Sequence, residues 1–580
     1  MAYELEPRYP VIGAITRGFG PLADELSRIA STFAAHHVPT ATDRPGWAAW
    51  PPTVALDGPA AIDWRGFAAQ LGAELGRRNV AHRLIDARVR LAEFAEIVRR
   101  TESAGLRDDP VFARTYPGHL EDLLASGAPR IEPADGVLTI AFGAGSALAC
   151  DGAVWYVDLP KRLALRAVEE GRAANLGQPD GAAGSARRLL FVDWPVEDRH
   201  RRSLAGRWSR YVDASDPAAP RSMDGESLRE SLRAVAAGPF RTRPAFLPVP
   251  WGGKWAREVL GARDPGPNAG LGYELIAPES GILLGDAPSL EVALDVMLAY
   301  EPAGILGSRV IEKFGIAFPI RFDYLDTVSG SDLSVHCHPR PDYMRTVFGV
   351  PITQHETYYV MVTRPEARIF LGLRDDTDSE AFRAAAMRSA SEGIDLDIER
   401  FVITHPARAH QLYLIPAGTP HGSGEGNVVL EISATPYLYS LRFFDWLRKD
   451  LKGGFRPVQL DHAFANLAFD RRGDEVRALV AETTVVRTGD GFRELAFGTH
   501  PDLFFAVHRL EVETTIEDDT AGRFAVLNLV EGESVAIRTA SGREHALAYA
   551  ETIVLPANVG RYAIIRTSGG PAKLVKAFVS

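Results

Sequence analysis

The chain has 580 residues and a mass of 63.1 kDa, which predicts about three to five domains and excludes a single small module. Apolar residues make up 46% and charged residues 24%, proportions that exclude a disordered or fibrous chain. The formal net charge is −11 and no long basic tract interrupts it, so nucleic acid is not an expected partner.

Cysteine content and hydropathy indicate the cellular compartment in which the protein is expected. The two cysteines, Cys150 and Cys337, allow at most one disulfide and exclude a multi-thiolate zinc site. No stretch reaches the roughly 18 consecutive apolar residues of a membrane span, and residues 1–10 contain glutamates in place of an apolar signal core. We therefore expect a cytoplasmic protein without a membrane partner.

The first third alternates between helical and strand patterns. Several stretches have the apolar spacing of amphipathic helices: residues 22–35, 64–75 and 91–103. Other short apolar runs have the composition and flanking turns of strands: residues 139–142, 153–159 and 189–193. This alternation predicts an α/β domain with parallel strands over residues 1–238.

Glycines in the same third raise the question of phosphate binding, because Gly-rich loops before helices cradle phosphate with backbone N–H groups. Candidates are Gly18, Gly20 and the loop at 177–186. Nowhere does the sequence place Gly, four residues, Gly, Lys and Ser or Thr in succession. The segments YVDLPKRLALRAVEEGRAANLG and FVDWPVEDRHRR weakly resemble a nucleoside-kinase-like domain without its phosphate loop. We expect a structural or docking domain without nucleotide chemistry.

The pattern changes at the proline cluster of residues 241–253, which places a boundary near Gly238. Residues 311–444 form a succession of β-rich segments with one helical insertion at 379–391, which predicts a sandwich or jelly roll. A helical connection is expected over 445–467. The tail has further strand patterns, which predict a smaller C-terminal β-barrel: residues 524–531, 534–539 and 573–579. The predicted fold class is multidomain α/β plus all-β, with domains at 1–238, 239–455 and 456–580.

The strongest chemical signal is DLSVHCHP at residues 332–339. Because side chains alternate faces along a strand, His336 and His338 project together while Cys337 points the other way, toward a core. Glu356 opens the next strand, and His421 follows the Pro-Gly turn of LIPAGTPHGSGEGN. Three imidazoles and one carboxylate on neighbouring strands predict a metal site suited to zinc, iron, manganese or nickel.

Two further histidines lie in the same region. His405 and His410 occur in THPARAHQ, without a partner at ligand spacing. We interpret both as ordinary core or surface residues.

Ordered motifs between residues 244 and 446 carry a family resemblance: PWGGKW, YELIAPE, FPIRFDYLD, DLSVHCHP, HETYYVM, LIPAGTPHGSGEGNVVLEIS and YSLRFFDW. In this order they resemble the type I mannose-6-phosphate isomerases, zinc-dependent members of the cupin superfamily. The resemblance implies a cupin jelly roll with a helical insertion at 239–455. It also implies one divalent metal ion, with zinc foremost and iron, manganese, nickel or cobalt as alternatives.

The resemblance also assigns roles to single residues. His338, Glu356 and His421 match metal ligands, and His336 stands where the family usually has a glutamine ligand. Three further positions match the family. Glu431 and Arg442 match residues implicated in proton transfer, and Ser334 matches a residue near the substrate phosphate. Such a reaction moves a proton between neighbouring carbons through an enediol, so the site needs an electrophile and a general base. Glu431 is the candidate base, and Arg442 would stabilise the enediolate charge.

The sequence departs from the family pattern at three positions. His336 in place of glutamine gives three His and one Glu, a set that many iron or manganese cupin oxygenases also use. Gln354 and Asp323 stand where the family has lysines. Arg321 lies on the same strand face as Asp323 and is a candidate substitute for the anion contact.

The sequence as a whole predicts a metal-dependent isomerase that interconverts mannose 6-phosphate and fructose 6-phosphate, with a phosphorylated hexose as its substrate. Two alternatives remain open. One is a cupin dioxygenase-type oxidoreductase with the same ligands, and the other is a non-catalytic sugar-binding regulatory protein. The sequence indicates no oligomeric state.

Overall fold

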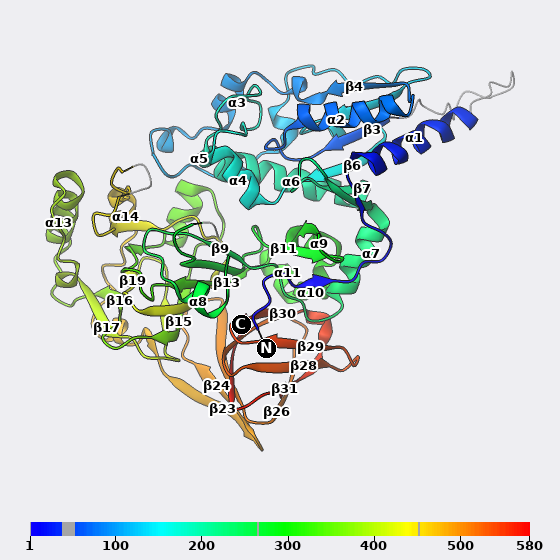
Figure 1. Cartoon of the computed structure of the whole chain (residues 1–580). Coiled ribbons are helices and arrows are strands. Elements are labelled where there is room, and N and C mark those ends of the chain that lie inside the picture. The colour runs from blue at the N-terminus through cyan, green and yellow to red at the C-terminus, as the bar shows by residue number, and fades with distance from the viewer. Residues whose placement is uncertain (1, 37–52, 264–265, 450–452) are drawn as a thin grey trace. The chain divides into compact units, whose positions relative to one another are not determined.

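A computed structural model describes residues 2–36, 53–263, 266–449 and 453–580 (Figure 1). The chain divides into two compact units. The first comprises Arg8–Arg233 and Gly281–Tyr300, and the second comprises Met1–Pro7, Ala234–Ser280 and Glu301–Ser580. The predicted limits of three domains, at 1–238, 239–455 and 456–580, stay a prediction.

The first unit is built on a sheet in the order β2-β8-β7-β6-β3-β5-β4. Its strands are β2 (Thr16–Arg17), β8 (Arg221–Asp224), β7 (Trp208–Asp213), β6 (Ala153–Asp158), β3 (Thr53–Asp57), β5 (Leu138–Phe142) and β4 (His82–Asp86). The five strands from β7 to β4 pair in parallel, whereas β8 and β2 add antiparallel pairs. Every residue of β3 and β5 is buried, as in parallel sheets covered on both faces. The predicted parallel α/β arrangement is confirmed.

Amphipathic helices cover this sheet (Figure 1). They include α1 (Phe19–His36), α2 (Trp64–Arg77), α3 (Phe94–Thr101), α4 (Lys161–Glu169) and α7 (Gly225–Ala236), and α1 to α3 confirm the helices predicted from the sequence. In α2 the buried Trp64, Phe67, Leu71 and Leu75 recur at helical spacing and pack on the strands. In the part of the chain that is described, no helix has both the length and the apolar character needed to cross a membrane.

The strand predicted at 189–193 is wrong. These residues form a π-helical segment, η5 (Leu189–Asp193), that joins α5 (Ala186–Arg188) to α6 (Trp194–Leu204). Short apolar runs do not distinguish a buried strand from a buried helix, and here tertiary contacts decide. The Asp193 carboxylate accepts hydrogen bonds from Asn175 Nδ2 at 2.7 Å and from the Leu176 N–H at 3.2 Å, which fixes the helical turn.

In the loop between β3 and α2, backbone N–H groups donate to carboxyl groups of the protein where a phosphate loop would bind an anion. Asp63 caps α2 by accepting from the Gly66 N–H at 2.9 Å, and the Ala60 N–H donates to Glu197 at 2.7 Å. These contacts agree with the missing phosphate-loop sequence, because the Ala60 and Gly66 N–H groups already donate to carboxyl groups of the protein.

The second unit contains a pair of antiparallel sheets that carry the candidate ligands. One has the order β22-β18-β15-β20-β13-β10-β9 and the other β17-β16-β19-β14-β21. The first sheet contains β22 (Val480–Ala481), β18 (Leu412–Ile415), β15 (Glu356–Thr363), β20 (Asn427–Ala434), β13 (Ile320–Asp326), β10 (Leu271–Leu275) and β9 (Ala245–Leu247). The second contains β17 (Val402–Pro406), β16 (Arg368–Leu373), β19 (His421–Ser423), β14 (Val335–Cys337) and β21 (Leu441–Phe444). The predicted helical insertion is α13 (Ser379–Glu392), capped by Asp378.

The last hundred residues form another pair of antiparallel sheets, β23-β24-β25-β32-β27-β30 and β26-β31-β28-β29. Their strands are β23 (Thr483–Gly489), β24 (Phe492–Phe497), β25 (Phe505–Val512), β26 (Thr515–Asp519), β27 (Ala525–Glu531), β28 (Ser534–Thr539), β29 (Glu544–Ala548), β30 (Thr552–Leu555), β31 (Arg561–Arg566) and β32 (Ala572–Val579). Leu527, Ile537 and Leu574 belong to one apolar core that both sheets share. The three strands predicted in this tail are confirmed.

The helical connection expected over 445–467 is largely wrong. Within its described residues the helix is limited to α14 (Leu460–Asn466), and residues 450–452 lie outside the described part. Gly453 has a φ of +85°, a conformation that an α-helix does not accept, and Pro457 follows it.

Candidate metal centre

Strand pairing brings the three predicted histidine ligands together. His336 lies in β14 directly opposite His421 of the antiparallel neighbour β19. His338 follows β14, and its ring centroid is 5.2 Å from that of His336, as expected for side chains two residues apart on one face. Cys337 between them is fully buried, and burial raises the pKa of its thiol, so the predicted core position is confirmed.

Glu356 comes from the other sheet, where it is the first residue of β15. Its Oε1 lies 2.9 Å from His338 Nε2, and its Oε2 lies 3.2 Å from His421 Nε2. One ligand atom from each of the four residues lies within 4.8 Å of the other three, and all four side chains are buried. The structure therefore brings together the four predicted ligands, three from one sheet and one from the other.

A tight turn sets the position of His421. Gly418 has a φ of +85°, and a Cβ there would approach the Asn466 carbonyl oxygen to 2.6 Å. The Gly418 N–H donates to the His338 carbonyl oxygen at 3.0 Å. The turn is thereby tied to the end of the strand that supplies the first two histidines.

Backbone carbonyls fix the orientation of every imidazole. Each Nδ1 lies at hydrogen-bond distance from a carbonyl oxygen: 2.9 Å for His336 and Ser334, 3.1 Å for His338 and Tyr439, and 2.9 Å for His421 and Thr419. Donation from Nδ1 leaves the lone pair on Nε2, which is the atom that faces Glu356 in two of these rings. This second layer of contacts is typical of histidines that bind a metal.

Unsatisfied polar atoms test whether a cation fits between these residues. Glu356 Oε2 and His421 Nε2 are buried and lie 3.2 Å apart, and neither forms a hydrogen bond with any other described residue. Leaving such atoms unpaired costs roughly 1–3 kcal/mol each. A divalent ion would satisfy both atoms, and the set of three nitrogens and one carboxylate suits zinc, iron, manganese or nickel. The residues present fit a metal ion without selecting one.

The protonation states agree with metal binding. Burial and the neighbouring imidazoles hold the pKa of His336 well below its usual range, and burial lowers the pKa of His338. Both shifts favour the neutral imidazole, which is the form that ligates metals. Burial alone would raise the pKa of Glu356, but His338, His421 and Arg321 outweigh it and hold that pKa well below its usual range.

An arginine connects the ligand Glu356 to the predicted base Glu431. In the larger sheet, Ser433 of the central strand β20 lies between two partners. It is paired with Arg321 of β13 on one side and with Glu356 of β15 on the other. Arg321 Nη2 donates to Glu356 Oε1 at 2.8 Å and to Glu431 Oε1. Its Nη1 lies 3.8 Å from the Asp323 carboxylate. Arg321, predicted as an anion contact for substrate, is 4% exposed and already has these three carboxylate partners.

Glu431 is itself 4% exposed, opposite Asp323 on the neighbouring strand. Burial raises the pKa of its carboxyl well above the usual range, although Arg321 opposes the shift. The Ser433 hydroxyl donates to its Oε1 at 2.8 Å. A carboxyl group whose pKa is raised holds a proton more readily than an ordinary glutamate, as a general acid–base group requires.

Gln354 supports the centre in a way that the sequence did not reveal. Its Nε2 donates to Glu356 Oε1 and lies 3.4 Å from His338 Nε2. The spacing of Gln354 from Glu356 could have indicated this contact, because residues two positions apart lie on the same face of an extended segment. In the sequence, Gln354 is recognisable only as the residue that replaces a family lysine.

The other predicted site residues border the centre. Arg442 lies in β21 opposite His336, and burial together with Arg456 lowers the pKa of its guanidinium to about 10. Its Nε has no hydrogen-bond partner among the described residues. Ser334 is 5% exposed, and its carbonyl oxygen holds His336.

The two excluded histidines lie outside the cluster. His410 contacts the Tyr359 hydroxyl and the Glu531 carboxylate, and His405 is half-buried.

Comparisons with known proteins give different results for the two parts of the chain. A family model described as a domain of unknown function (DUF8485) matches residues 27–237. A mannose-6-phosphate isomerase of Streptococcus mutans is 23% identical over 314 residues, covering 53% of this chain and 88% of that protein. The mannose-6-phosphate isomerase ManA of Bacillus subtilis is 30% identical over 149 residues, covering 25% of this chain and 43% of that protein.

A solved structure of the Bacillus subtilis mannose 6-phosphate isomerase matches with a TM-score of 0.48 and 19% identity. The match covers 59% of this chain and 99% of that one. These relatives are mannose-6-phosphate isomerases that match from a quarter to about half of the chain at 23–30% identity. The predicted nucleoside-kinase-like resemblance of residues 1–238 finds no support in these matches.

Metal removal tests the centre directly. We expect one divalent ion per chain in the purified protein, and a lower melting temperature after chelation because a bound ion stabilises the folded state. His421→Ala should lose the ion, whereas His405→Ala, outside the cluster, should retain it. Elemental analysis with thermal unfolding measures both quantities. Equal metal content in the two variants would contradict the assignment.

Removal of Arg321 tests the carboxylate network. Arg321→Met leaves three buried carboxylates without their cation, and breaking a buried ion pair costs about 3–5 kcal/mol. We expect denaturant unfolding at a lower midpoint, partly restored by adding Glu431→Gln. The matched control is Arg345→Met, since the Arg345 side chain is 61% exposed in its pair with Asp342. An unchanged midpoint for Arg321→Met would mean that the network contributes nothing to stability.

Proposed function

We propose that the protein is a metal-dependent sugar isomerase that interconverts mannose 6-phosphate and fructose 6-phosphate through an enediol. The observation that carries this proposal is the buried Glu431, whose pKa is raised and which Arg321 links to the ligand Glu356. The similarity to mannose-6-phosphate isomerases, over 88% of the length of the Streptococcus mutans protein, supports the sugar isomerase class.

The four ligand side chains would hold the ion, with His336, His338 and His421 through Nε2 and Glu356 through its carboxylate. When bound, a dication supplies electrophilic stabilisation for the oxygens on the two reacting carbons. The carbonyl contacts at each Nδ1 keep the rings in the ligating tautomer without any rearrangement.

Glu431 is the proposed proton carrier. It takes the proton from one carbon and returns it to the neighbouring carbon, while Arg321 holds the carboxyl in place. Its raised pKa makes the carboxylate a stronger base than an ordinary glutamate, which favours removal of the carbon-bound proton. Arg442 would stabilise the enediolate charge, and Ser334 would lie near the substrate phosphate.

The ligand set favours one second candidate, an oxygenase-type oxidoreductase. His336 gives three His and one Glu, and its Nδ1 contact with the Ser334 carbonyl leaves its Nε2 for a metal. An oxygenase would require a redox-active ion and would consume oxygen with substrate.

Proton NMR of the full-length protein with mannose 6-phosphate in deuterated water tests the reaction. We expect fructose 6-phosphate to appear with deuterium at the exchanged carbon, and chelation to stop it. Glu431→Gln should lower turnover by about 10²–10⁴-fold, the range for loss of general acid–base catalysis, with metal retained. The control is Glu425→Gln, because Glu425 is exposed in the loop after β19.

Each alternative has its own result in this assay. Substrate-dependent oxygen uptake without fructose 6-phosphate would identify the oxygenase. Binding of mannose 6-phosphate without turnover in metal-loaded protein would identify a regulatory sugar-binding protein and contradict the isomerase.

A further inference from the structure

A phosphorylated sugar at the metal centre needs a cation for its phosphate, which carries about −1.5 to −2 at pH 7. The family lysines are replaced by Gln354 and Asp323. Arg321, the predicted substitute, is 4% exposed and lies within 4 Å of the carboxylates of Glu356, Glu431 and Asp323. The charge for a phosphate therefore has to come from another part of the second unit.

Arg442 of β21 lies between the metal centre and further positive charge. It is paired with His336 of β14, and residues directly opposite in an antiparallel pair share a face of the sheet. Burial together with the positive charges of Arg456 and Arg448 lowers the pKa of Arg442, and Asp445 opposes this effect. The surroundings of Arg442 are thus rich in arginine, and they are next to a metal ligand.

The other two arginines share one carboxylate, that of Asp445, which is 3% exposed. Arg456 Nη1 donates to Asp445 Oδ2 at 2.7 Å, and Arg448 Nη2 lies 3.4 Å from Asp445 Oδ1. The Arg456 N–H also donates to the Arg448 carbonyl oxygen at 2.9 Å, which holds the two residues side by side. Among the described residues, Asp445 is the one carboxylate within 4 Å of these arginines.

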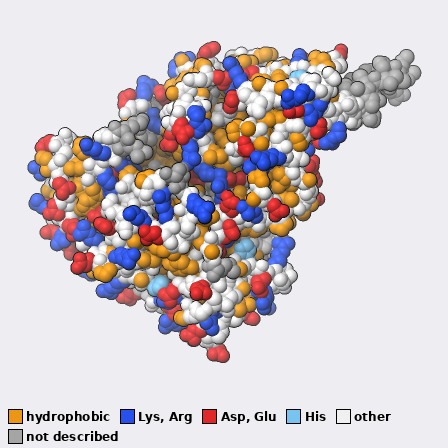
Figure 2. All heavy atoms as spheres, viewed as in Figure 1, with side chains coloured by type: hydrophobic (Ala, Val, Ile, Leu, Met, Phe, Trp, Pro, Cys, Tyr) orange, Lys and Arg blue, Asp and Glu red, His pale blue; other side chains and the backbone are white. Residues whose placement is uncertain are grey.

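This excess of positive charge differs from the surface elsewhere. Figure 2 shows Lys and Arg side chains interspersed with Asp and Glu side chains on the face in view. At the loop after β21, in contrast, three guanidinium groups surround one carboxylate. A dianion such as phosphate would balance the remaining charge, and guanidinium groups match the geometry of phosphate oxygens.

Two contacts hold the arginine loop against the segment that leads into β14. Trp446 Nε1 donates to the Leu333 carbonyl oxygen at 3.0 Å, and Arg448 Nη2 donates to the Asp332 carbonyl oxygen. The next residue of that segment is Ser334, which the family resemblance places near the substrate phosphate. The loop and Ser334 therefore border the same side of the metal centre.

Solvent can reach the arginines of this loop. The side chain of Arg456 is 17% exposed and that of Arg448 is 15% exposed. Arg456 contacts Asp445 through Nη1, so other N–H donors of the same guanidinium are left for a second anion.

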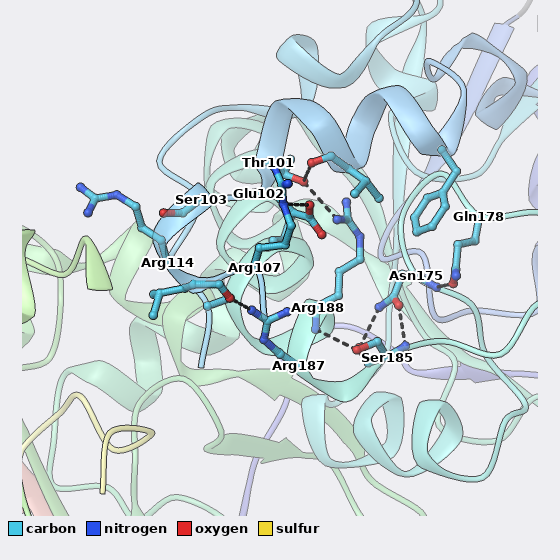
Figure 3. A pocket seen from close by; sticks show the side chains of 15 residues that line it. Thr101, Glu102, Ser103, Arg107, Arg114, Asn175, Gln178, Ser185, Arg187 and Arg188 are labelled. Atoms are coloured by element: carbon cyan, nitrogen blue, oxygen red, sulfur yellow. Dashed lines mark hydrogen bonds and ion pairs between the residues drawn. The ribbon is translucent and has the colours of Figure 1, made fainter. Parts of the chain in front are cut away.

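A cavity of about 260 Å³ in the first unit is also lined by arginines, but it offers no comparable cation (Figure 3). There Arg188 Nη1 donates to Thr101 Oγ1 at 3.0 Å, and Arg188 Nε faces the buried Asp193 carboxylate at 3.6 Å. A carboxylate of the protein thus already offsets the charge of Arg188.

We propose that Arg456 binds the phosphate of the sugar directly, that Arg448 adds to the positive charge there, and that the centre is thereby specific for phosphorylated sugars. The inference rests on the proposed function, in which the reacting carbons lie at the metal. In a hexose 6-phosphate the reacting carbons are C1 and C2, so the phosphate at C6 requires a subsite that is near the metal and separate from it.

Calorimetric titration of the metal-loaded, full-length protein with sorbitol 6-phosphate tests the subsite, because this polyol phosphate has no carbonyl group and cannot isomerise. We expect one sorbitol 6-phosphate per chain and much weaker binding of sorbitol. Arg456→Gln should weaken sorbitol 6-phosphate binding by about 10–100-fold, the range for loss of a hydrogen bond to a charged group, with metal content unchanged. Arg456→Lys should recover part of the loss.

The matched control is Arg477→Gln, because Arg477 at the end of α15 (Asp474–Arg477) has a 66% exposed side chain. It should bind sorbitol 6-phosphate like the unmodified protein. Three results would overturn the proposal: equal affinities of Arg456→Gln and Arg477→Gln, equal affinities for sorbitol and sorbitol 6-phosphate, or no binding at millimolar sorbitol 6-phosphate.

Kinetics separate this proposal from the proposed function. Arg456→Gln should raise KM for mannose 6-phosphate with little change in kcat, since the phosphate contact is the same in ground state and transition state. Isomerisation with an unchanged KM in Arg456→Gln would contradict the subsite alone. Binding of sorbitol 6-phosphate that depends on Arg456, without any isomerisation, would contradict the proposed function alone.

A second variant covers failure of Arg456→Gln to fold. Arg448→Gln leaves Asp445 with its closer partner, Arg456. We expect weaker sorbitol 6-phosphate binding with a smaller dependence on salt, because one fewer cation attracts the dianion. Unchanged affinity and salt dependence in Arg448→Gln would count against the subsite.

Discussion

The contact on which the candidate centre depends is the buried cation of Arg321 among three carboxylates. Glu356, Glu431 and Asp323 project from adjacent strands of one sheet, and each is 4% exposed or less. Without the guanidinium, desolvation and mutual repulsion would favour their neutral forms, and Glu356 would be a poorer metal ligand. Arg321 opposes the effect of burial on the pKa of both Glu356 and Glu431. The further contacts of Glu356 with His338 and His421 hold its pKa well below the usual range, whereas burial keeps that of Glu431 raised.

The sandwich provides the geometry that this chemistry needs. The smaller sheet supplies the imidazoles through the pairing of β14 with β19, and the larger sheet supplies the carboxylates through β13, β20 and β15. Neither sheet contains a complete site by itself. Since strand register fixes which residues face one another, a one-residue slip would turn every ligand to the opposite face.

In the first unit, buried and capping carboxyl groups hold backbone N–H groups in place of a metal ion. At the β3–α2 loop, Asp63 and Glu197 accept hydrogen bonds from backbone N–H groups that a phosphate loop would offer to an anion. The backbone N–H groups at the start of α2 are therefore satisfied by side chains of the protein itself.

The sequence by itself determined the local features whose cause is local. Alternation along a strand put His336 and His338 on one face, helical spacing placed α1, α2 and α3, and the order of motifs identified Glu356 and His421 as ligand candidates. The family resemblance also indicated Glu431 as the candidate base. The tertiary structure decided the rest. Arg321 and Glu431 are 110 positions apart in sequence, and their contact follows from the register of β13 with β20.

Contacts that the local sequence pattern does not show also account for the two wrong predictions. The apolar run at 189–193 is compatible with strand and helix alike, and contacts of Asp193 with Asn175 and Leu176 made it helical. The expected helix over 445–467 is limited to Leu460–Asn466 within the described residues. Local pattern thus fixed which side chains share a face. Only tertiary pairing decided which charges meet, because the free energy of a buried charge depends on partners that are distant in sequence.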